Sequence, residues 1–128
     1  SIKHDISVPV SAIPAFLADA GEALSAAWPG IEIVAFGHAG DGNLHYNLTM
    51  LDPAANQRLL AEAKVINRVV HDLVAQHHGS ISAEHGIGLL KKARMFDIKT
   101  PVELHLMRAL KHTLDPHNLM NPHKVLPD

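Results

Sequence analysis

The sequence predicts an α+β fold with a ferredoxin-like βαββαβ order, in which an antiparallel sheet with two covering helices precedes C-terminal helices and an extended tail. Two observations lead to this prediction. Apolar residues recur at helical spacing in two separate stretches, and the β-prone runs beside them alternate apolar and polar residues. The pair Asp41-Gly42 also stands between the two central β-prone runs, and Asp-Gly there is the strongest short-range signal of a hairpin.

The first half of the chain is predicted as strand, helix and hairpin. Residues 6–10 form a short β-prone run, after which the Ser11 hydroxyl can cap a helix. That helix ends at Pro29-Gly30, and residues 31–36 and 43–50 form the hairpin strands. The apolar residues at helical spacing are Ile13, Phe16, Leu17, Ala20, Leu24 and Trp28.

The second half supplies a second covering helix, a fourth strand and a last helix. Gly79 is well placed as a left-handed C-cap of the second helix, and residues 80–82 can pair as the fourth strand. Residues 89–95 suit a short helix, and Thr100 with Glu103 forms a capping box for the last one, which Asp115-Pro116 ends. The apolar stripes are Leu59, Ala63, Ile66, Val70, Leu73 and His77 in the second helix, and Leu104, Met107, Leu110 and Leu114 in the last.

Length and composition narrow the class of protein. The 128 residues suit a single domain, 1–128, and the first residue is not Met, which suggests a fragment of a longer protein. With no cysteine there is no disulfide or thiolate-bound metal, and a net charge of −2 argues against nucleic acid as the partner. No stretch is apolar enough for a transmembrane segment. We expect a cytoplasmic protein, with peripheral membrane association through electron-acceptor partners as an alternative.

The predicted hairpin brings two histidines together. If Asp41 and Gly42 form the turn, His38 faces His45 on the neighbouring strand, with Cβ atoms about 4.5–5.5 Å apart. Both imidazoles could then reach one metal ion. The same alternation places Asn43, His45, Asn47 and Thr49 on a polar face, and Leu44, Tyr46, Leu48 and Met50 toward the core.

Glu84 and His85 supply the second part of the candidate site. Two histidines plus a carboxylate, with open coordination positions, form a common ligand set for a catalytic zinc or another divalent first-row metal such as manganese. Taken alone, His38 and His45 could instead be a polar cross-strand pair. His85 could be a fourth ligand, and Lys3 could be a solvated surface residue. His77 and His78 fit packing and a helix C-terminus better than a site.

Two long motifs identify a family. Gly37 to His45 reads Gly-His-Ala-Gly-Asp-Gly-Asn-Leu-His, and Ser82 to Gly88 reads Ser-Ala-Glu-His-Gly-Ile-Gly. Together with residues 3–9 and 115–124, they closely resemble the C-terminal domain of the FAD-linked oxidases that act on D-2-hydroxy acids. That family includes D-lactate dehydrogenase, D-2-hydroxyglutarate dehydrogenase and the glycolate oxidase flavin subunit.

The resemblance implies a role for each candidate residue. His38, His45 and Glu84 would bind a divalent metal, Asn47 and Lys3 would contact the substrate, and His85 would be the catalytic base. Asn121 in the tail would touch the FAD. Most of the FAD would be held by an N-terminal FAD-binding domain of the same polypeptide, and the substrate would be lactate, 2-hydroxyglutarate or glycolate; a homodimer is a further expectation. The alternative functions are a stand-alone metal-dependent hydrolase and a metal-free ferredoxin-like binding module.

Overall fold

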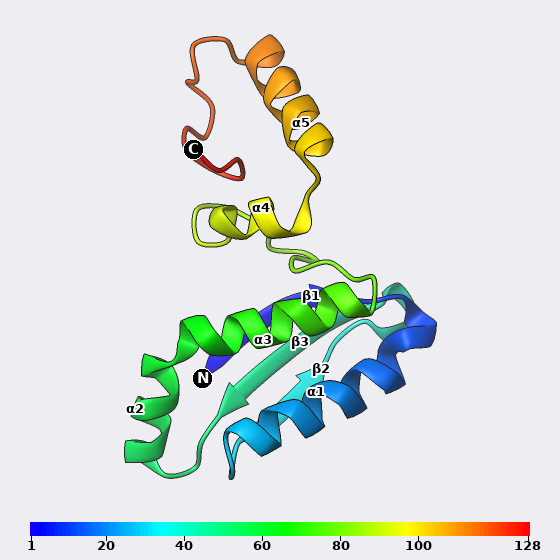
Figure 1. Ribbon diagram of the computed structural model, residues 1–128, viewed down its shortest axis with the longest axis vertical. Coiled ribbons are helices and arrows are strands. Elements are labelled where there is room, and N and C mark those ends of the chain that lie inside the picture. The colour runs from blue at the N-terminus through cyan, green and yellow to red at the C-terminus, as the bar shows by residue number, and fades with distance from the viewer. The chain divides into compact units, whose positions relative to one another are not determined.

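The computed structural model describes residues 1–128 and divides them into two compact units, residues 1–85 and 86–128 (Figure 1). The first unit contains a three-stranded antiparallel sheet in the order β1-β3-β2. Its strands are β1 (Ile2–Ser7), β2 (Glu32–Phe36) and β3 (Asn43–Thr49). Its helices are α1 (Ile13–Ala27), α2 (Pro53–Ala61) and α3 (Ala63–Gln76), with short 3-10 turns η1 (Val10–Ala12) and η2 (Ala39–Asp41). The predicted α+β class is confirmed.

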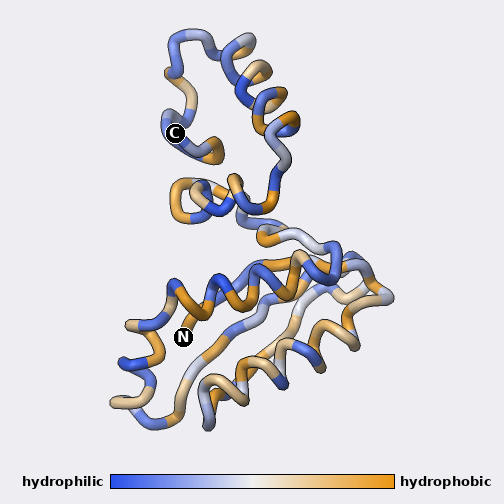
Figure 2. Tube along the Cα trace, viewed as in Figure 1, coloured by the Kyte–Doolittle hydropathy of each residue, from blue (hydrophilic) through white to orange (hydrophobic).

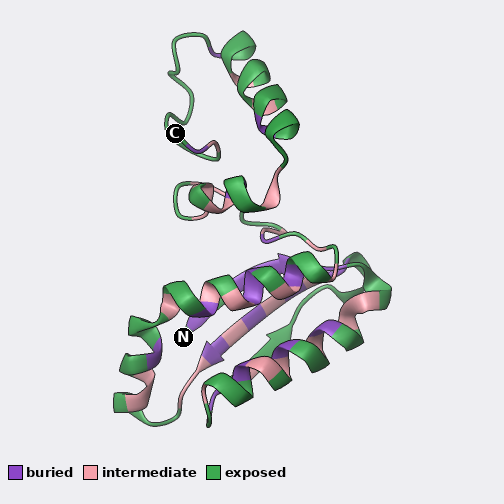
Figure 3. Ribbon diagram, in the orientation of Figure 1, coloured by how far each residue is buried: buried purple, intermediate pink, exposed green.

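Helices α1 and α3 lie side by side over one face of the sheet (Figure 1). Along β3, buried residues alternate with half-buried ones, as the purple and pink bands of Figure 3 show. Apolar and polar residues also intermingle along α3 (Figure 2), because only one side of that helix faces the sheet. The core formed this way contains Leu44, Tyr46 and Leu48 from β3, Phe16, Ala20 and Leu24 from α1, and Ile66, Val70 and Val74 from α3.

The predicted fourth strand is reduced to one bridge, in which Ser7 and Ser80 exchange backbone hydrogen bonds of 3.0 and 2.8 Å. Beyond it, the Ser80 hydroxyl bonds to the carbonyl and amide of Ser82. Such local side-chain bonds compete with a ladder, so the next backbone bond to β1 comes from Ala83, at 3.2 Å from the Asp5 oxygen. The segment therefore follows β1 without forming a regular strand.

Three helix boundaries differ from the predictions. The second helix, predicted as one, breaks at Glu62 into α2 and α3; its first part begins at Pro53, where the Asp52 carboxylate accepts from the Ala55 amide at 2.7 Å. Ser11 is not an N-cap, because it lies inside η1. The left-handed residue after α3 is His78 (φ 58°), not Gly79.

Gly79 has a different role from the one predicted. A Cβ at this position would lie 2.1 Å from the Ser7 carbonyl oxygen. The missing side chain therefore allows the chain to approach β1 closely enough for the Ser7–Ser80 bridge.

The hairpin loop is longer than the predicted two-residue turn. It spans residues 37–42, and Asp41 lies in η2 with negative φ, whereas a type I′ turn needs positive φ at both central residues. Only Gly42 of that pair is left-handed (φ 76°). Its carbonyl accepts from the Val8 amide at 3.0 Å, and a Cβ on it would lie 2.1 Å from the Val8 oxygen. Packing against the residues that follow β1 therefore overrides the local turn signal.

The second unit contains η3 (Lys92–Arg94), α4 (Met95–Ile98) and α5 (Pro101–Leu114), so the helix expected at residues 89–95 begins only at its end. The Thr100–Glu103 capping box of α5 is confirmed. Of its predicted apolar stripe, Leu104 is buried, but Leu110 and Leu114 are 63% and 75% exposed. Most of α5 is correspondingly green in Figure 3. No helix of the chain has the length and apolar character needed to cross a membrane.

Candidate active site

The sheet face opposite the helices carries two rows of side chains, polar on β1 and β3 and apolar on β2. Lys3, Asn47 and Val34 are directly opposite one another on β1, β3 and β2. Asp5, His45 and Phe36 form the next row. Neighbouring strands lie about 4.8 Å apart, and rows two residues apart are separated by about 7 Å. Residues from three strands are thus within reach of one small molecule.

Lys3 and Asn47 lie next to each other on neighbouring strands. They are direct cross-strand partners, Lys3 is exposed, and Asn47 is half-buried. An ammonium group beside a carboxamide offers several hydrogen-bond donors to a carboxylate. The pair is suited to hold an anionic substrate, and Val34, 53% exposed, adds an apolar neighbour.

His45 lies between an aromatic ring and a second imidazole. The Phe36 and His45 ring centroids are 5.1 Å apart, and the His45 and His85 centroids are 5.9 Å apart. Phe36 is 55% exposed, so this row continues into an apolar patch at the β2 edge.

His38 does not face His45, which corrects the predicted pairing. Phe36 takes that position, and His38 lies in the loop just before η2. Its Nε2 is nevertheless 3.9 Å from Glu84 Oε1, with the His38 side chain 69% exposed. The longer loop thus carries His38 toward Glu84 from beyond the end of the strand.

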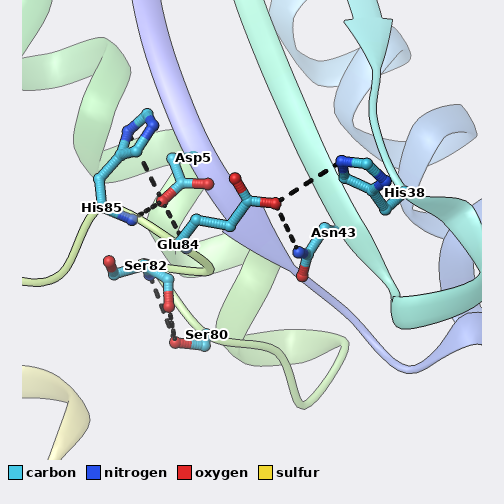
Figure 4. Close-up of polar contacts among 7 residues, drawn as sticks. All are labelled: Asp5, His38, Asn43, Ser80, Ser82, Glu84 and His85. Atoms are coloured by element: carbon cyan, nitrogen blue, oxygen red, sulfur yellow. Dashed lines mark hydrogen bonds and ion pairs between the residues drawn. The ribbon is translucent and has the colours of Figure 1, made fainter.

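Glu84 is held by β3 as well as by the loop. Asn43 donates its side-chain amide to Glu84 Oε1 at 3.0 Å, and His38 approaches the same oxygen (Figure 4). The imidazoles and carboxylate of His38, His45 and Glu84 are donors of the type that Zn²⁺ and Mn²⁺ accept. The structure does not gather three such side chains around one point, so the donor chemistry fits a metal while the coordination geometry is not formed.

Asp5 supports the segment that carries Glu84 and His85. Its carboxylate Oδ2 accepts from the Glu84 amide at 2.9 Å and from the His85 amide at 2.8 Å (Figure 4). The His85 ring remains 69% exposed, whereas the Asp5 side chain is only 4% exposed. The backbone of this segment is therefore anchored, and both of its side chains extend outward.

Asn121 belongs to the second unit. With φ of 46°, it lies in the tail after α5 and lines an apolar pocket of about 400 Å³ with Met107, Leu110 and Met120 among others. The Asp115 carboxylate orders this tail by accepting from the Leu119 and Met120 amides, each at 2.9 Å. A bond from the Lys111 ammonium, together with these amides, lowers the pKa of Asp115 to about 2.

Three neighbours of the site were not assigned a role from the sequence: Asp5, Asn43 and Phe36. Alternation along residues 3–7 could have revealed Asp5, because Lys3, Asp5 and Ser7 all project to the open face. Another histidine has a structural contact away from the site. His77 pairs with Asp19 of α1 at 2.8 Å, in agreement with its expected packing role.

Comparison with known proteins agrees with the motifs. The chain is 44% identical over 123 residues to a D-2-hydroxyglutarate dehydrogenase of Xanthomonas citri pv. viticola, a match that covers 96% of this chain and 26% of the relative. A D-2-hydroxyglutarate dehydrogenase of Stutzerimonas stutzeri is 40% identical with the same coverage. A putative mitochondrial D-lactate dehydrogenase of Schizosaccharomyces pombe is 38% identical over 132 residues, covering 97% of this chain and 24% of the relative.

The chain thus spans about a quarter of the length of these relatives. Residues 1–125 match the family described as FAD linked oxidases, C-terminal domain. Since the match extends over nearly the whole chain, this protein belongs to the family of the FAD-linked oxidase C-terminal domains.

Proposed function

We propose that this chain is the substrate-binding part of an FAD-dependent dehydrogenase that oxidises a D-2-hydroxy acid to the 2-oxo acid, with D-2-hydroxyglutarate as the leading substrate. The observation that carries the proposal is the open sheet face, where the Lys3–Asn47 pair lies one row from His45 and His85. Family membership and the names of the relatives support the choice of reaction and substrate. Lactate and glycolate are the competing substrates.

Substrate binding uses the charge of Lys3. Its ammonium group meets a substrate carboxylate, and the Asn47 amide donates a further hydrogen bond from the neighbouring strand. The substrate hydroxyl then lies toward the next row, within reach of an imidazole. In this scheme Lys3 and Asn47 bind and orient the substrate.

His85 removes the hydroxyl proton. Its exposed imidazole is the base, and the proton goes to a ring nitrogen as the C2–O single bond becomes a carbonyl. FAD, held mainly by a domain outside this chain, supplies the acceptor for the hydride that leaves C2. We propose that His38, His45 and Glu84 would together hold a divalent metal, zinc or manganese, whose chemistry when bound would be to polarise the substrate oxygens. The N-terminal FAD-binding domain of the same polypeptide is the proposed partner, and a homodimer the proposed assembly.

The test is substrate-dependent bleaching of the flavin in the complete flavoenzyme that contains this chain. D-2-hydroxyglutarate, D-lactate, glycolate and L-2-hydroxyglutarate are compared at matched concentrations. We expect reduction with the D-hydroxy acids and Lys3→Met to raise KM about tenfold or more, because an ionic contact to the carboxylate is lost. Methionine keeps an unbranched side chain of similar size at position 3 and lacks the ammonium group, both its charge and its hydrogen-bond donors.

Two results would contradict the proposal. No flavin reduction with any hydroxy acid would reject the dehydrogenase. Metal-dependent ester or amide hydrolysis by the isolated chain would favour the hydrolase alternative instead.

A further inference from the structure

The segment from Ser82 to His85 bears the proposed base and a proposed metal ligand, yet no regular strand or helix holds it. Ala83, Glu84 and His85 are bends, Ser82 has no regular structure, and only Ser80, before the segment, is paired in a β-bridge. Reacting groups need positions held within about 0.5 Å. Something other than secondary structure must therefore fix the segment.

Asp5 is the residue that meets this need. It faces the open side of the sheet in the same row as His45, but it is only 4% exposed because the 82–85 segment covers it. Three consecutive backbone amides end on this one residue. The Ala83 amide donates to the Asp5 carbonyl at 3.2 Å, and the Glu84 and His85 amides donate to Asp5 Oδ2 at 2.9 and 2.8 Å.

This anchor determines where two side chains go. Glu84 reaches the Asn43 amide at 3.0 Å, and the His85 ring lies 5.9 Å from the ring of His45. Asn43 and His45 are two residues apart on β3 and so project from the same face. Fixing the two peptide groups at Asp5 thus aligns Glu84 and His85 with successive positions of the central strand, as Figure 4 shows for the Glu84 contact.

We infer that Asp5 is a positioning residue, which holds the Glu84–His85 backbone so that the His85 imidazole meets the substrate in one orientation. The effect of Asp5 on catalysis rests on the proposed function, whereas its contacts with the Glu84 and His85 amides do not. Asp5 is not assigned a proton-transfer role. Its Oδ2 lies 3.7 Å from His85 Nδ1, beyond hydrogen-bond range, and the same oxygen already accepts two amide hydrogens.

The first test measures backbone hydrogen exchange at Glu84 and His85 by NMR in the 128-residue chain. Asp5→Ala removes the acceptor, so exchange of these two amides should become at least about tenfold faster. Asp5→Asn keeps an oxygen that can accept both amides without the charge, so protection should largely remain. Exchange at the Ser80 amide, bonded to the Ser7 carbonyl, serves as the internal reference.

The second test measures kcat and KM in the complete flavoenzyme. A misplacement of about 1 Å can cost roughly 10²-fold in rate, so Asp5→Ala should lower kcat by about that factor. KM should change by less than about threefold, because Lys3 and Asn47 still bind the substrate. Asp5→Asn should recover most of the loss. Ile6→Val, next to Asp5 on the same strand but pointing into the core, is the control for general destabilisation and should retain kcat.

Some results would overturn the inference. Unchanged exchange at Glu84 and His85 in Asp5→Ala would show that the carboxylate does not hold them. An Asp5→Asn variant as impaired as Asp5→Ala would show that charge, and not the acceptor geometry, matters. A parent enzyme inactive toward every hydroxy acid would reject the proposed function, while the exchange test of the anchor would still decide the structural claim.

Discussion

Replacing Tyr46 with Phe is expected to stabilise the N-terminal unit, because the Tyr46 hydroxyl is buried without a hydrogen-bond partner. Tyr46 is 0% exposed, and its ring packs edge-on against Phe16 with centroids 5.6 Å apart. A buried polar group left unpaired costs about 1–3 kcal/mol, so removing it should raise the free energy of unfolding by about 1 kcal/mol at neutral pH. The ring contact with Phe16 is kept.

The difference between the two proteins should grow at alkaline pH. Burial raises the pKa of Tyr46 from 10 to about 12. Between these pH values the folded state binds more protons than the unfolded state. The stability that the protonated Tyr46 hydroxyl gives the folded state is therefore fully present below pH 10 and is lost as the pH rises through 12. A rise of this size corresponds to about 3 kcal/mol. The variant lacks this loss, whereas the lysines titrate in both proteins and cancel in the comparison.

Urea denaturation followed by Trp28 fluorescence provides the assay. Trp28 is the single Trp of the chain, and its indole donates to Glu62 within the N-terminal unit at 2.5 Å. Tyr46→Leu is the matched control, since it removes the ring and should destabilise the unit. If Tyr46→Phe lowered the free energy of unfolding by more than about 0.5 kcal/mol, the hydroxyl would have a partner and the reasoning would be refuted.

Three further predictions concern the site. Gly42→Ala should destabilise the unit by about 2 kcal/mol or more in urea denaturation, because the new Cβ overlaps the Val8 carbonyl. Gly40→Ala in the same loop has open space around the new Cβ and should cost under about 1 kcal/mol, so equal losses in the two variants would contradict the clash. Zn²⁺ or Mn²⁺ at a hundredfold excess over Kd should stabilise the chain by roughly 2.7 kcal/mol in a thermal melt, and His38→Ala should reduce this effect; no shift with any first-row metal would count against the proposed site. In the complete enzyme, His85→Asn should lower kcat by about 10²–10⁴-fold and retain the metal, whereas Glu84→Ala should lose both activity and metal. Kinetics and metal analysis of the two variants test this, and a metal-free His85→Asn would show that another residue is the base.

Periodicity located the main helices and the two faces of the central strand, whereas the predicted fourth strand is only a single bridge. Alternation along residues 43–49 correctly assigned Leu44, Tyr46 and Leu48 to the core and Asn43, His45 and Asn47 to the open face. Helical spacing located α1 and the buried side of α3, and the capping box located the start of α5. These features depend on neighbours within a few residues, so the sequence contains them directly.

The register at the end of the hairpin depended on the tertiary structure. Asp41-Gly42 is a strong local turn signal, but contacts between Gly42 and Val8, thirty-four residues earlier in the chain, produce a longer loop. A change of turn shifts which residues face each other. His38 was consequently misplaced, although its motif still brought it to 3.9 Å from Glu84.

The sequence by itself therefore determined the fold class, the two sheet faces and, through its motifs, the family and most of the candidate residues. Only the tertiary structure decided which of those residues lie together. It places Lys3 beside Asn47 on neighbouring strands, and it anchors the Glu84 and His85 backbone on Asp5. Asp5 and His85 are eighty residues apart, and no local pattern encodes a hydrogen bond between a buried carboxylate and a distant backbone amide. Such contacts depend on the packing of the 80–85 segment along β1, which only the folded chain provides.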